Sequence, residues 1–459
     1  MKKNVTNLMF ILMILSSIFV SSAYADVNDK KRYLILFKQA ELGESKSSLQ
    51  NLIENGVDTS QTMSSGTAEA KQAIADNLNL DGEVIIIWDG INGVMVNIDQ
   101  TEVDRLSTLE QVKSIEEDML MTPDVMEKPL IEKGEEENGE EENGEEETRT
   151  LITQKNAGWG LARLHQGTAT SDNSYQYKYD GSGRTIYVLD SGLNINNPKV
   201  AAEFGSRASI LSDVNFAGKG EDCTGHGTMV SSAAAGKTYG VAKGATLKMV
   251  KITEGCHIYT FDSSSVTAIN WITKNAPKGS IIVRSYGIRD RGPGIPIPCK
   301  RTRSAPALEV AIKKAHDAGM FVVLSAGNDA CDTKNYSPKN IPESFVVGST
   351  SNLDFINGKD RIASFSRKGT NISAFAPGTN LLLMNKDGQP ISNSGTSFSA
   401  PYVAGTIAVV CQAVKPLCES KDMTYLYDVF RGTGTLNTVT NTDGTPLTGA
   451  TSRFISQQW

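Results

Sequence analysis

From Ile152 onward, short runs of β-branched and other apolar residues alternate with stretches of helical character. These runs include residues 185–189, 247–252, 281–283, 321–324 and 345–347. Such alternation is typical of a parallel β-sheet whose strands are joined by helices. In sheets of this kind, reactive groups gather at the carboxyl ends of the strands. We therefore expect residues 152–459 to form a three-layer αβα domain around a mostly parallel sheet, with any catalytic groups along that edge.

The segment between Arg32 and Leu120 has a different pattern. It predicts strands at 33–37, 83–88, 94–98 and 112–116 and helices at 45–55 and 102–107. This order of elements indicates a small α+β, ferredoxin-like domain, which we place at residues 26–126.

Residues 127–151 follow as an acidic segment in which a Gly-Glu-Glu-Glu-Asn unit repeats. Self-repulsion and the lack of apolar residues in the repeat, at residues 134–147, predict an extended linker. A plain spacer is favoured over a partner-binding tail. Because this block dominates the net charge of −7, the charge of the whole chain says little about partners, and it gives no support to nucleic-acid binding.

The first 25 residues have the pattern of a cleavable signal peptide. Two lysines precede an apolar stretch at residues 8–20, and a small-x-small site ends at Ala25. The apolar stretch is shorter than the roughly 20 residues that a membrane-spanning helix needs. We therefore expect a secreted protein, cut after Ala25, rather than one anchored in a membrane.

Two polar residues are candidates for the catalytic edge. Asp190 ends the strand 185–189, although an ordinary turn also explains its position. His226 lies between Gly225 and Gly227 at the start of a predicted helix, where an idle histidine is the simpler alternative. A carboxylate bonded to one imidazole nitrogen leaves the other nitrogen free to take a proton. Of the four histidines, only His226 has flanking glycines that admit a substrate.

A hydroxyl and a carboxamide complete the set. Ser397 lies at the start of an apolar helix, where a serine cap is common but where the helix amides also favour developing negative charge. Asn328 follows the strand 321–324, as asparagines in turns do. The co-occurrence of an acid, a base, a nucleophile and a donor, each at a strand end or helix start, indicates a catalytic site rather than four separate turns.

The chain order Asp, His, Ser distinguishes classes of serine hydrolase. Chymotrypsin-like enzymes have the order His, Asp, Ser, and α/β-hydrolases have Ser, Asp, His together with a G-x-S-x-G motif that residues 395–399 lack. With the motifs NAGWGLAR at 156–163 and DCTGHGT at 222–228, the chain resembles the subtilisin family, and within it the proteinase-K-like branch, from Ile152 to about Phe454. The resemblance implies that Asp190, His226 and Ser397 form the triad and that Asn328 is the oxyanion donor.

The resemblance also implies two segments that flank an extended substrate by strand pairing. Their residues are Ser285, Tyr286, Gly287, Ser325, Ala326 and Gly327. The chain departs from the family here, because Ile288 stands where a second glycine is usual and Arg284 precedes the first segment. We expect a narrower cleft and a preference for apolar or aromatic P1 residues, the residue on the amino side of the cut bond.

Two further departures concern oxidation and metal binding. Phe398 follows the nucleophile where the family usually has methionine, so we expect activity to survive mild peroxide. The family's calcium ligands correspond to the carbonyls of Pro342 and Ser344 and to Ser373, where a carboxylate is usual. The missing charge predicts at most a weak calcium site, and no cofactor is needed for the chemistry.

The first domain resembles the family's inhibitory propeptide, which templates folding and covers the active site until it is cut. We expect autocatalytic cleavage between Met119 and Asn156. Protein or peptide substrates and the propeptide itself are the expected partners, and the mature enzyme is expected to be a monomer.

Six cysteines in an exported chain favour disulfides, and no C-x-x-C motif supports a zinc site. The suggested pairs, among other possible pairings, are Cys223–Cys256, Cys299–Cys331 and Cys411–Cys418.

Together these features predict a secreted serine endopeptidase. Two alternatives stay open at this point. In the first, the chain keeps the fold but is a binding protein whose catalysis is impaired. In the second, the enzyme is a processing protease of narrow specificity. Labelling by an active-site serine phosphonate separates the first alternative from the enzyme.

Overall fold

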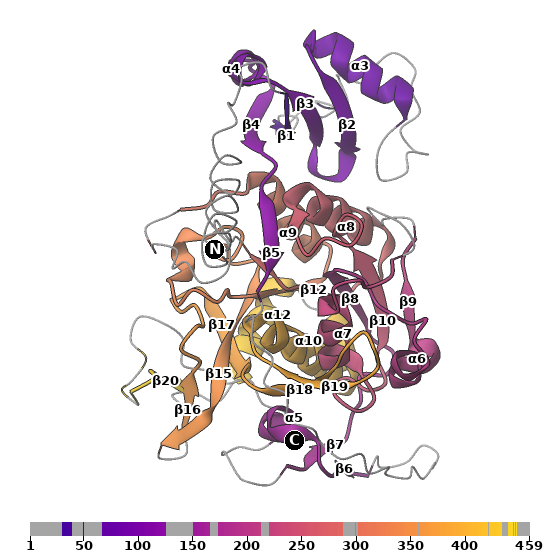
Figure 1. The fold of residues 1–459 in the computed structure, drawn as a ribbon. Helices are drawn as coiled ribbons and strands as arrows, with labels where there is room; N and C mark the ends of the chain where they lie inside the picture. Colours follow the sequence, from indigo (N-terminus) through magenta and orange to yellow (C-terminus); the bar gives the residue numbers. More distant parts are fainter. Residues whose placement is uncertain are drawn as a thin grey trace, which may run out of the picture. The chain divides into compact units, whose positions relative to one another are not determined.

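The computed structural model describes most of the chain between residues 30 and 447 (Figure 1). The described residues are 30–38, 49, 67–124, 150–165, 173–212, 220–287, 299, 302–356, 359–420, 422–433, 439–443, 445 and 447. The predicted signal peptide, the predicted helix at 45–55 apart from Leu49, nearly all of the acidic linker and Ile288 lie outside this set. Two compact units are present, one of residues up to Ile87 plus Asn92–Glu117, the other of Trp88–Ile91 plus the chain from Asp118 onward.

The first unit is an antiparallel sheet with helices. Its strands follow the order β2-β3-β1-β4, and β1 is antiparallel to both of its neighbours. The elements are β1 (Lys31–Phe37), α3 (Ala68–Leu78), β2 (Glu83–Trp88), β3 (Gly93–Ile98), α4 (Gln100–Ser107) and β4 (Val112–Glu117). This is the strand order of a ferredoxin-like module. Helix α3 was missed in the sequence, although Thr67 caps it by accepting a hydrogen bond from the amide of Ala70 at 3.1 Å.

The second unit is built on a nine-stranded sheet with the order β20-β16-β15-β14-β12-β8-β10-β9, and β17 pairs with β15. The strands from β15 to β9 in this order are parallel to their neighbours, and β16 is antiparallel to β15. The strands are β8 (Thr185–Asp190), β9 (Ala208–Ile210), β10 (Thr246–Lys251), β12 (Ile281–Arg284), β14 (Phe321–Ser325), β15 (Phe345–Ile356), β16 (Lys359–Ile362), β17 (Ile372–Pro377) and β20 (Val439–Thr440). The predicted mostly parallel sheet is confirmed.

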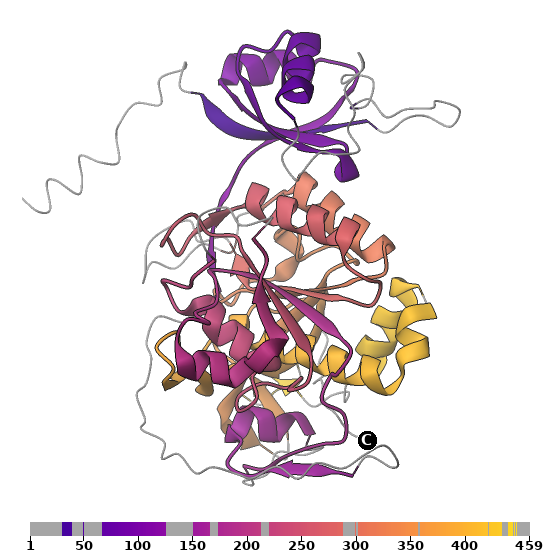
Figure 2. The same ribbon diagram turned by 90° about the vertical axis from the view of Figure 1, so that its right-hand side faces the viewer.

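Helices cover both faces of this sheet (Figures 1 and 2). On one face α7 (His226–Ala235) and α10 (Thr396–Ala413) pack against each other and against the central strands, while α8 (Asp262–Asn275) and α9 (Pro306–Asp317) pack together on the opposite face. Every residue of β12 and β14 is buried. Strands covered on both faces have continuous apolar runs instead of alternating ones, which is the pattern seen in the sequence.

Shorter elements complete the second unit. They are η2 (Asp89–Ile91), β5 (Leu120–Pro123), β6 (Ile152–Gln154), α5 (Gly158–His165), β7 (Tyr175–Tyr177), α6 (Pro198–Phe204), η3 (Gly205–Arg207), β11 (Thr260–Phe261), β13 (Tyr286–Gly287), η4 (Thr333–Asn335), β18 (Leu381–Met384), β19 (Pro390–Asn393), α11 (Lys415–Ser420) and α12 (Met423–Thr433). Disulfides join Cys223 to Cys256, Cys299 to Cys331 and Cys411 to Cys418, the pairs that the sequence suggested. Within the described ranges, none of the helices is long and apolar enough to span a bilayer.

Candidate active site

Asp190 and His226 meet where β8 ends and α7 begins. Oδ1 of Asp190 lies 2.7 Å from Nδ1 of His226, and both side chains are buried. Nε2 of His226 is also buried, and it has no hydrogen-bond partner among the described residues. Because the carboxylate holds Nδ1, Nε2 is the nitrogen that is available to take up a proton.

The first turn of α7 is held by Asp222, whose position in the DCTGHGT motif gave no sign of this role. Its carboxylate accepts hydrogen bonds from the amides of Gly225 and Thr228, both at 2.8 Å. Ser191 donates to the same carboxylate at 2.8 Å and accepts from the amide of Gly227 at 2.9 Å. These bonds satisfy backbone amides at the helix start that have no partner within the helix, and they join the helix to the turn after β8.

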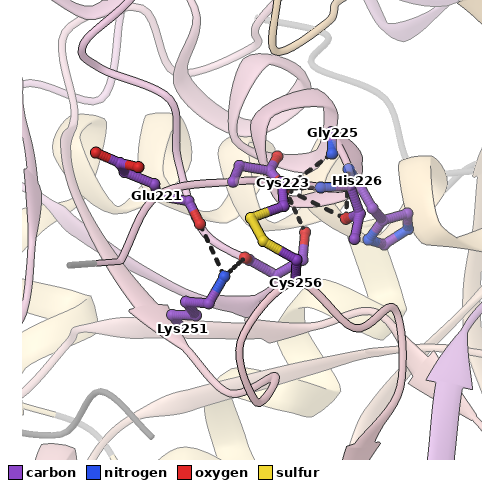
Figure 3. The surroundings of a disulfide bond; sticks show 9 residues. Glu221, Cys223, Gly225, His226, Lys251 and Cys256 are labelled. Carbon is purple, nitrogen blue, oxygen red and sulfur yellow. Dashed lines mark hydrogen bonds between the residues drawn. A yellow bond between two sulfur atoms is a disulfide. The ribbon is translucent and has the colours of Figure 1, made fainter. Parts of the chain in front are cut away.

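A disulfide braces the loop that leads into α7 (Figure 3). It links Cys223, close to the helix start, to Cys256 in the loop after β10. Next to it, Nζ of Lys251 donates to the carbonyls of Ser191 at 2.8 Å and Glu221 at 2.7 Å. The histidine-bearing helix is therefore tied to two neighbouring parallel strands, which limits movement of its first residue.

Ser397 is the second residue of α10, and it is fully buried. Gly395 precedes the helix with a φ of 150°, a backbone conformation that favours glycine. Oγ of Ser397 donates to the carbonyl of Ser285 at 3.3 Å, and its amide donates to the carbonyl of Asp124 at 3.0 Å. The ring of Phe398 lies 5.8 Å from the ring of His226, so the start of α10 and the histidine share one site.

Asn328 follows β14 and is oriented by the start of α10. Its Oδ1 accepts hydrogen bonds from the amide of Thr396 at 3.0 Å and from the hydroxyl of Thr396 at 2.9 Å. Its Nδ2 is buried and has no partner among the residues described. This side-chain amide and the backbone amide of Ser397 are two donors of the type that stabilises an oxyanion.

A segment of the chain itself lies along the expected substrate strand. β5 pairs antiparallel with β13 on one side and with β11 on the other, and it is labelled in Figure 1. At its end, the amide of Asp124 donates to the carbonyl of Ser285 at 3.1 Å, and the Asp124 carbonyl accepts from Ser397. Residues 120–124 are thus bound as an extended peptide that adds a strand to the cleft, with a carbonyl next to Ser397.

The second flanking strand differs from the one expected. Ser285, Tyr286 and Gly287 line one side of β5, but the other side is formed by β11 and not by residues 325–327. Ser325 ends β14 in the main sheet, and its hydroxyl donates a hydrogen bond to Oδ2 of Asp124 at 2.6 Å. The amide of Gly327 donates to the hydroxyl of Thr396. A two-residue strand such as β11 has too little pattern to be found from sequence.

Arg284 does not narrow the cleft, contrary to the expectation from sequence. Its side chain is fully buried, with Nε donating to Ser265 at 2.8 Å and Nη1 donating to the carbonyl of Tyr286 at 3.1 Å. Burial lowers the pKa of its guanidinium to about 10. The arginine therefore supports β13, the expected substrate strand, through the carbonyl of Tyr286.

The residues expected to hold calcium do not fit the ion. Arg431 on α12 donates to the carbonyls of Pro342 at 3.0 Å and Ser344 at 3.5 Å, and its Nε donates to the hydroxyl of Ser373 at 3.4 Å. The guanidinium of Arg431 thus forms hydrogen bonds with the oxygen atoms that a calcium ion would need, and its positive charge repels such an ion. These contacts argue against calcium binding at the three positions that the resemblance implied. The described part of the chain also contains no cluster of three or more His, Cys, Asp or Glu side chains suited to a metal.

Comparisons with known proteins agree with this architecture. Residues 181–428 match the model of the Subtilase family. The chain is 29% identical over 386 residues to an extracellular serine proteinase of Thermus sp. (strain Rt41A), which covers 83% of this chain and 80% of that protein. It is 33% identical over 280 residues to Proteinase T of Parengyodontium album, covering 58% of this chain and 85% of the relative.

Solved structures give the same result. A cold adapted subtilisin-like serine proteinase superposes with a TM-score of 0.55 at 30% identity, covering 66% of this chain and 98% of that one. Fervidolysin from Fervidobacterium pennivorans has a TM-score of 0.59 at 17% identity, covers 94% of this chain and 60% of its own, and shows the fold alone. The family match extends over more than half of the chain and contains each of the candidate catalytic residues. The chain therefore belongs to the subtilase family.

Proposed function

We propose that this subtilase is a secreted serine endopeptidase in which Ser397 is the nucleophile and His226 is the general base and acid. Asp190 orients His226, and Asn328 acts as an oxyanion donor together with the amide of Ser397. One observation carries the proposal: a peptide carbonyl is bound at the Ser397 amide, in a site where Asp190 lies 2.7 Å from His226. The family membership supports the reaction class.

The proposed reaction has two steps. Oγ of Ser397 attacks the carbonyl carbon of the substrate while Nε2 of His226 takes the hydroxyl proton. The oxyanion accepts hydrogen bonds from Ser397 N–H and Asn328 Nδ2, the carbon–nitrogen bond breaks, and His226 returns the proton to the leaving amine. Water, activated by the same histidine, then hydrolyses the acyl-enzyme.

We further propose that the N-terminal part, after removal of the signal peptide, inhibits the precursor. This proposal is supported by β5, which pairs with β11 and β13 in the place expected for a substrate. A bound peptide whose carbonyl already accepts from Ser397 blocks access by other substrates until it is released. Secretion is supported by the pattern of residues 1–25 and by the extracellular relative.

Active-site labelling tests the enzymatic proposal. Wild-type protein should react with a fluorophosphonate and hydrolyse casein, while Ser397→Ala and His226→Ala should do neither. Matched controls are Ser206→Ala and His257→Ala, since both residues are exposed and neither belongs to the site. Ser397→Ala should also accumulate as the uncut precursor. A wild-type protein that is neither labelled nor active on casein would instead favour a binding function, and a fully active Ser397→Ala variant would show that Ser397 is not the nucleophile.

A further inference from the structure

The side chain of Asp124 enters a closed pocket beside Ser397. Its Oδ2 accepts hydrogen bonds from the Ser325 hydroxyl at 2.6 Å and from Nζ of Lys339 at 2.8 Å. Asp124 is 7% exposed and Lys339 is 2% exposed. Gly287 closes another side, because a Cβ at that position would lie 2.4 Å from Oδ1 of Asp124. The pocket therefore surrounds a short carboxylate side chain tightly.

The pocket contains a buried cation whose counter-ion comes with the bound peptide. Within the described part of the chain, Lys339 forms an ion pair with Asp124 and with no other carboxylate. The nearby guanidinium of Arg367 has its own partner, since its Nε donates to Asp329 at 2.6 Å, and it stacks on the ring of Tyr336 at 3.4 Å. A buried ammonium without a partner is costly, so this pocket favours a ligand that carries a carboxylate.

The charge states agree with this geometry. Burial opposes ionisation of Asp124, but Lys339 and the hydrogen bonds outweigh burial and hold the pKa of the carboxyl below its ordinary value. Burial lowers the pKa of Lys339 to about 8, although Asp124 acts to raise it. Both groups are therefore charged at neutral pH, and the contact between them is a true ion pair.

The backbone contacts give Asp124 the position of a P1 residue. Its amide donates to Ser285, its carbonyl accepts from Ser397, and the preceding residues pair with both flanking strands. A side chain in the P1 position enters the pocket that sets specificity, so the Asp124 carboxylate occupies that pocket. In the proposed mechanism, the carbonyl carbon of Asp124 is the one that Ser397 attacks.

We infer that this enzyme cleaves after aspartate, with Lys339 and Ser325 recognising the P1 carboxylate, and that it matures by cutting its own Asp124–Val125 bond. The inference rests on the proposed function of Ser397. In the maturation step the peptide bond breaks, water adds a hydroxyl to the Asp124 carbonyl carbon, and the released Val125 amine gains a proton. This replaces the apolar or aromatic P1 preference expected from the family resemblance.

Asparagine is the sharpest comparison, because it has the shape of aspartate without the charge. P1 asparagine leaves the buried Lys339 ammonium without a counter-ion, and P1 leucine or phenylalanine also leaves the Ser325 hydroxyl without its acceptor. Removing one partner of a buried ion pair lowers affinity by a factor on the order of a hundred to a thousand. We expect the same scale for the ratio of kcat/KM between P1 aspartate and P1 asparagine.

Peptide substrates built on the bound segment test the inference. The mature wild-type enzyme is assayed with acetyl-Met-Thr-Pro-X-aminomethylcoumarin, where X is Asp, Asn, Leu or Phe. We expect kcat/KM for Asp to exceed each of the others by about a hundredfold or more. Equal or faster cleavage after Leu or Phe would overturn the inference. Loss of cleavage of all four peptides and of casein, together with no fluorophosphonate labelling, would overturn the proposed function instead.

Two variants assign the preference to Lys339. In Lys339→Met, the preference for Asp over Asn should fall to within about threefold of unity, the result expected when the charge that discriminates them is absent. Fluorophosphonate labelling selects for folded protein. Lys334→Met is the matched control, because Lys334 is an exposed lysine on the neighbouring turn, and its substrate ratio should equal the wild-type ratio. A Lys339→Met enzyme that labels normally and keeps the full ratio would contradict the assignment.

A precursor assay covers the case in which Lys339→Met does not fold. Precursor carrying Ser397→Ala is offered to mature wild-type enzyme, with and without Asp124→Leu, and the products are sequenced. With Asp124 present, the product should begin at Val125, and with Asp124→Leu that product should form at least about a hundredfold more slowly. Equal rates of cutting at this bond in both precursors would show that Asp124 is not recognised.

Discussion

At the scale of single residues, the candidate catalytic groups are held in place by side chains that have no role in bond breaking. Asp222 binds the amides at the start of α7, and Thr396 donates twice to Asn328. Asp190 binds Nδ1 of His226 and Thr396 binds Oδ1 of Asn328, while Nε2 of His226 and Nδ2 of Asn328 have no partner among the described residues. Such support is what allows polar groups to act on a substrate without reorganising.

The pH dependence of specificity follows from Lys339. This lysine is charged below its pKa of about 8 in the bound complex and neutral above it, so the kcat/KM ratio of Asp to Asn substrates should fall as pH rises through 8. The charged groups around it are Asp124, Arg284 and Arg367. Asp124 stays ionised because its pKa lies below the ordinary value, and Arg284, with a pKa of about 10, stays largely charged.

The ratio is measured on one enzyme preparation between pH 6 and pH 9, so that any effect of pH that is common to both substrates cancels. A ratio that is constant over this range would show that the lysine charge does not set the preference.

Asn328→Leu should lower kcat by a factor of about a hundred to a thousand and change KM little, because the lost bond forms with the oxyanion and not with the ground-state carbonyl. Steady-state kinetics on the Asp peptide measures this effect. Thr396→Val removes only the hydroxyl that helps orient Asn328, so it should cost less. A larger loss in Thr396→Val than in Asn328→Leu would show that Asn328 is not the oxyanion donor.

At the scale of elements, α12 connects two segments of the chain through one arginine. Arg431 near its end binds the carbonyls of Pro342 and Ser344 and the hydroxyl of Ser373, and its charge repels a cation. The helix thereby connects the loop before β15 to the start of β17. A side chain that is covalently part of the chain provides this contact at any calcium concentration.

Chelation and mutation test the contributions of calcium and of Arg431 separately. Excess EDTA should leave the melting temperature of the mature enzyme unchanged, whereas Arg431→Ala should lower the free energy of unfolding by about 1–3 kcal/mol, because carbonyl acceptors lose their donor. Both are measured by thermal and urea unfolding. Lys415→Ala, at an exposed position on α11, is the control and should have no effect. A steep fall in melting temperature with EDTA would mean that calcium is structural after all.

At the scale of the whole second unit, a buried ion pair connects its N-terminal helix to a distant part of the sheet. Nε and Nη2 of Arg163 on α5 bind the two carboxylate oxygens of Asp360 on β16 at 3.0 and 2.6 Å, and both side chains are almost completely buried. The contact spans 197 residues of sequence, so it forms only when the complete domain has folded.

Removing one member of this pair should destabilise the domain strongly. Asp360→Ala removes the carboxylate that binds the buried guanidinium through two hydrogen bonds, and it should lower the free energy of unfolding by about 3–5 kcal/mol. Urea unfolding of the Ser397→Ala background avoids self-digestion during the measurement. The double variant Arg163→Met/Asp360→Leu removes both charges and should recover most of the loss. If the loss in free energy of unfolding is smaller for Asp360→Ala than for the double variant, the ion pair does not stabilise the fold.

Sequence by itself determined the features that depend on local pattern. The strands of the main sheet follow from short apolar runs, and the positions of Asp190, His226, Ser397 and Asn328 follow from being next to a strand end or a helix start. Because parallel strands present their carboxyl ends along one edge, local placement was enough to predict that these residues share a site. The roles assigned to them stay predictions.

Only the tertiary structure decided which distant residues are in contact. Lys339 and Asp124 are 215 residues apart, and nothing in the local pattern around either one indicates an ion pair. The same holds for β11 beside the bound segment, for Arg284 behind the cleft and for Arg431 at the expected calcium position. The physical reason is that the environment of a charge is set by packing of loops from separate parts of the chain, whereas strand and helix patterns are set by neighbours in sequence.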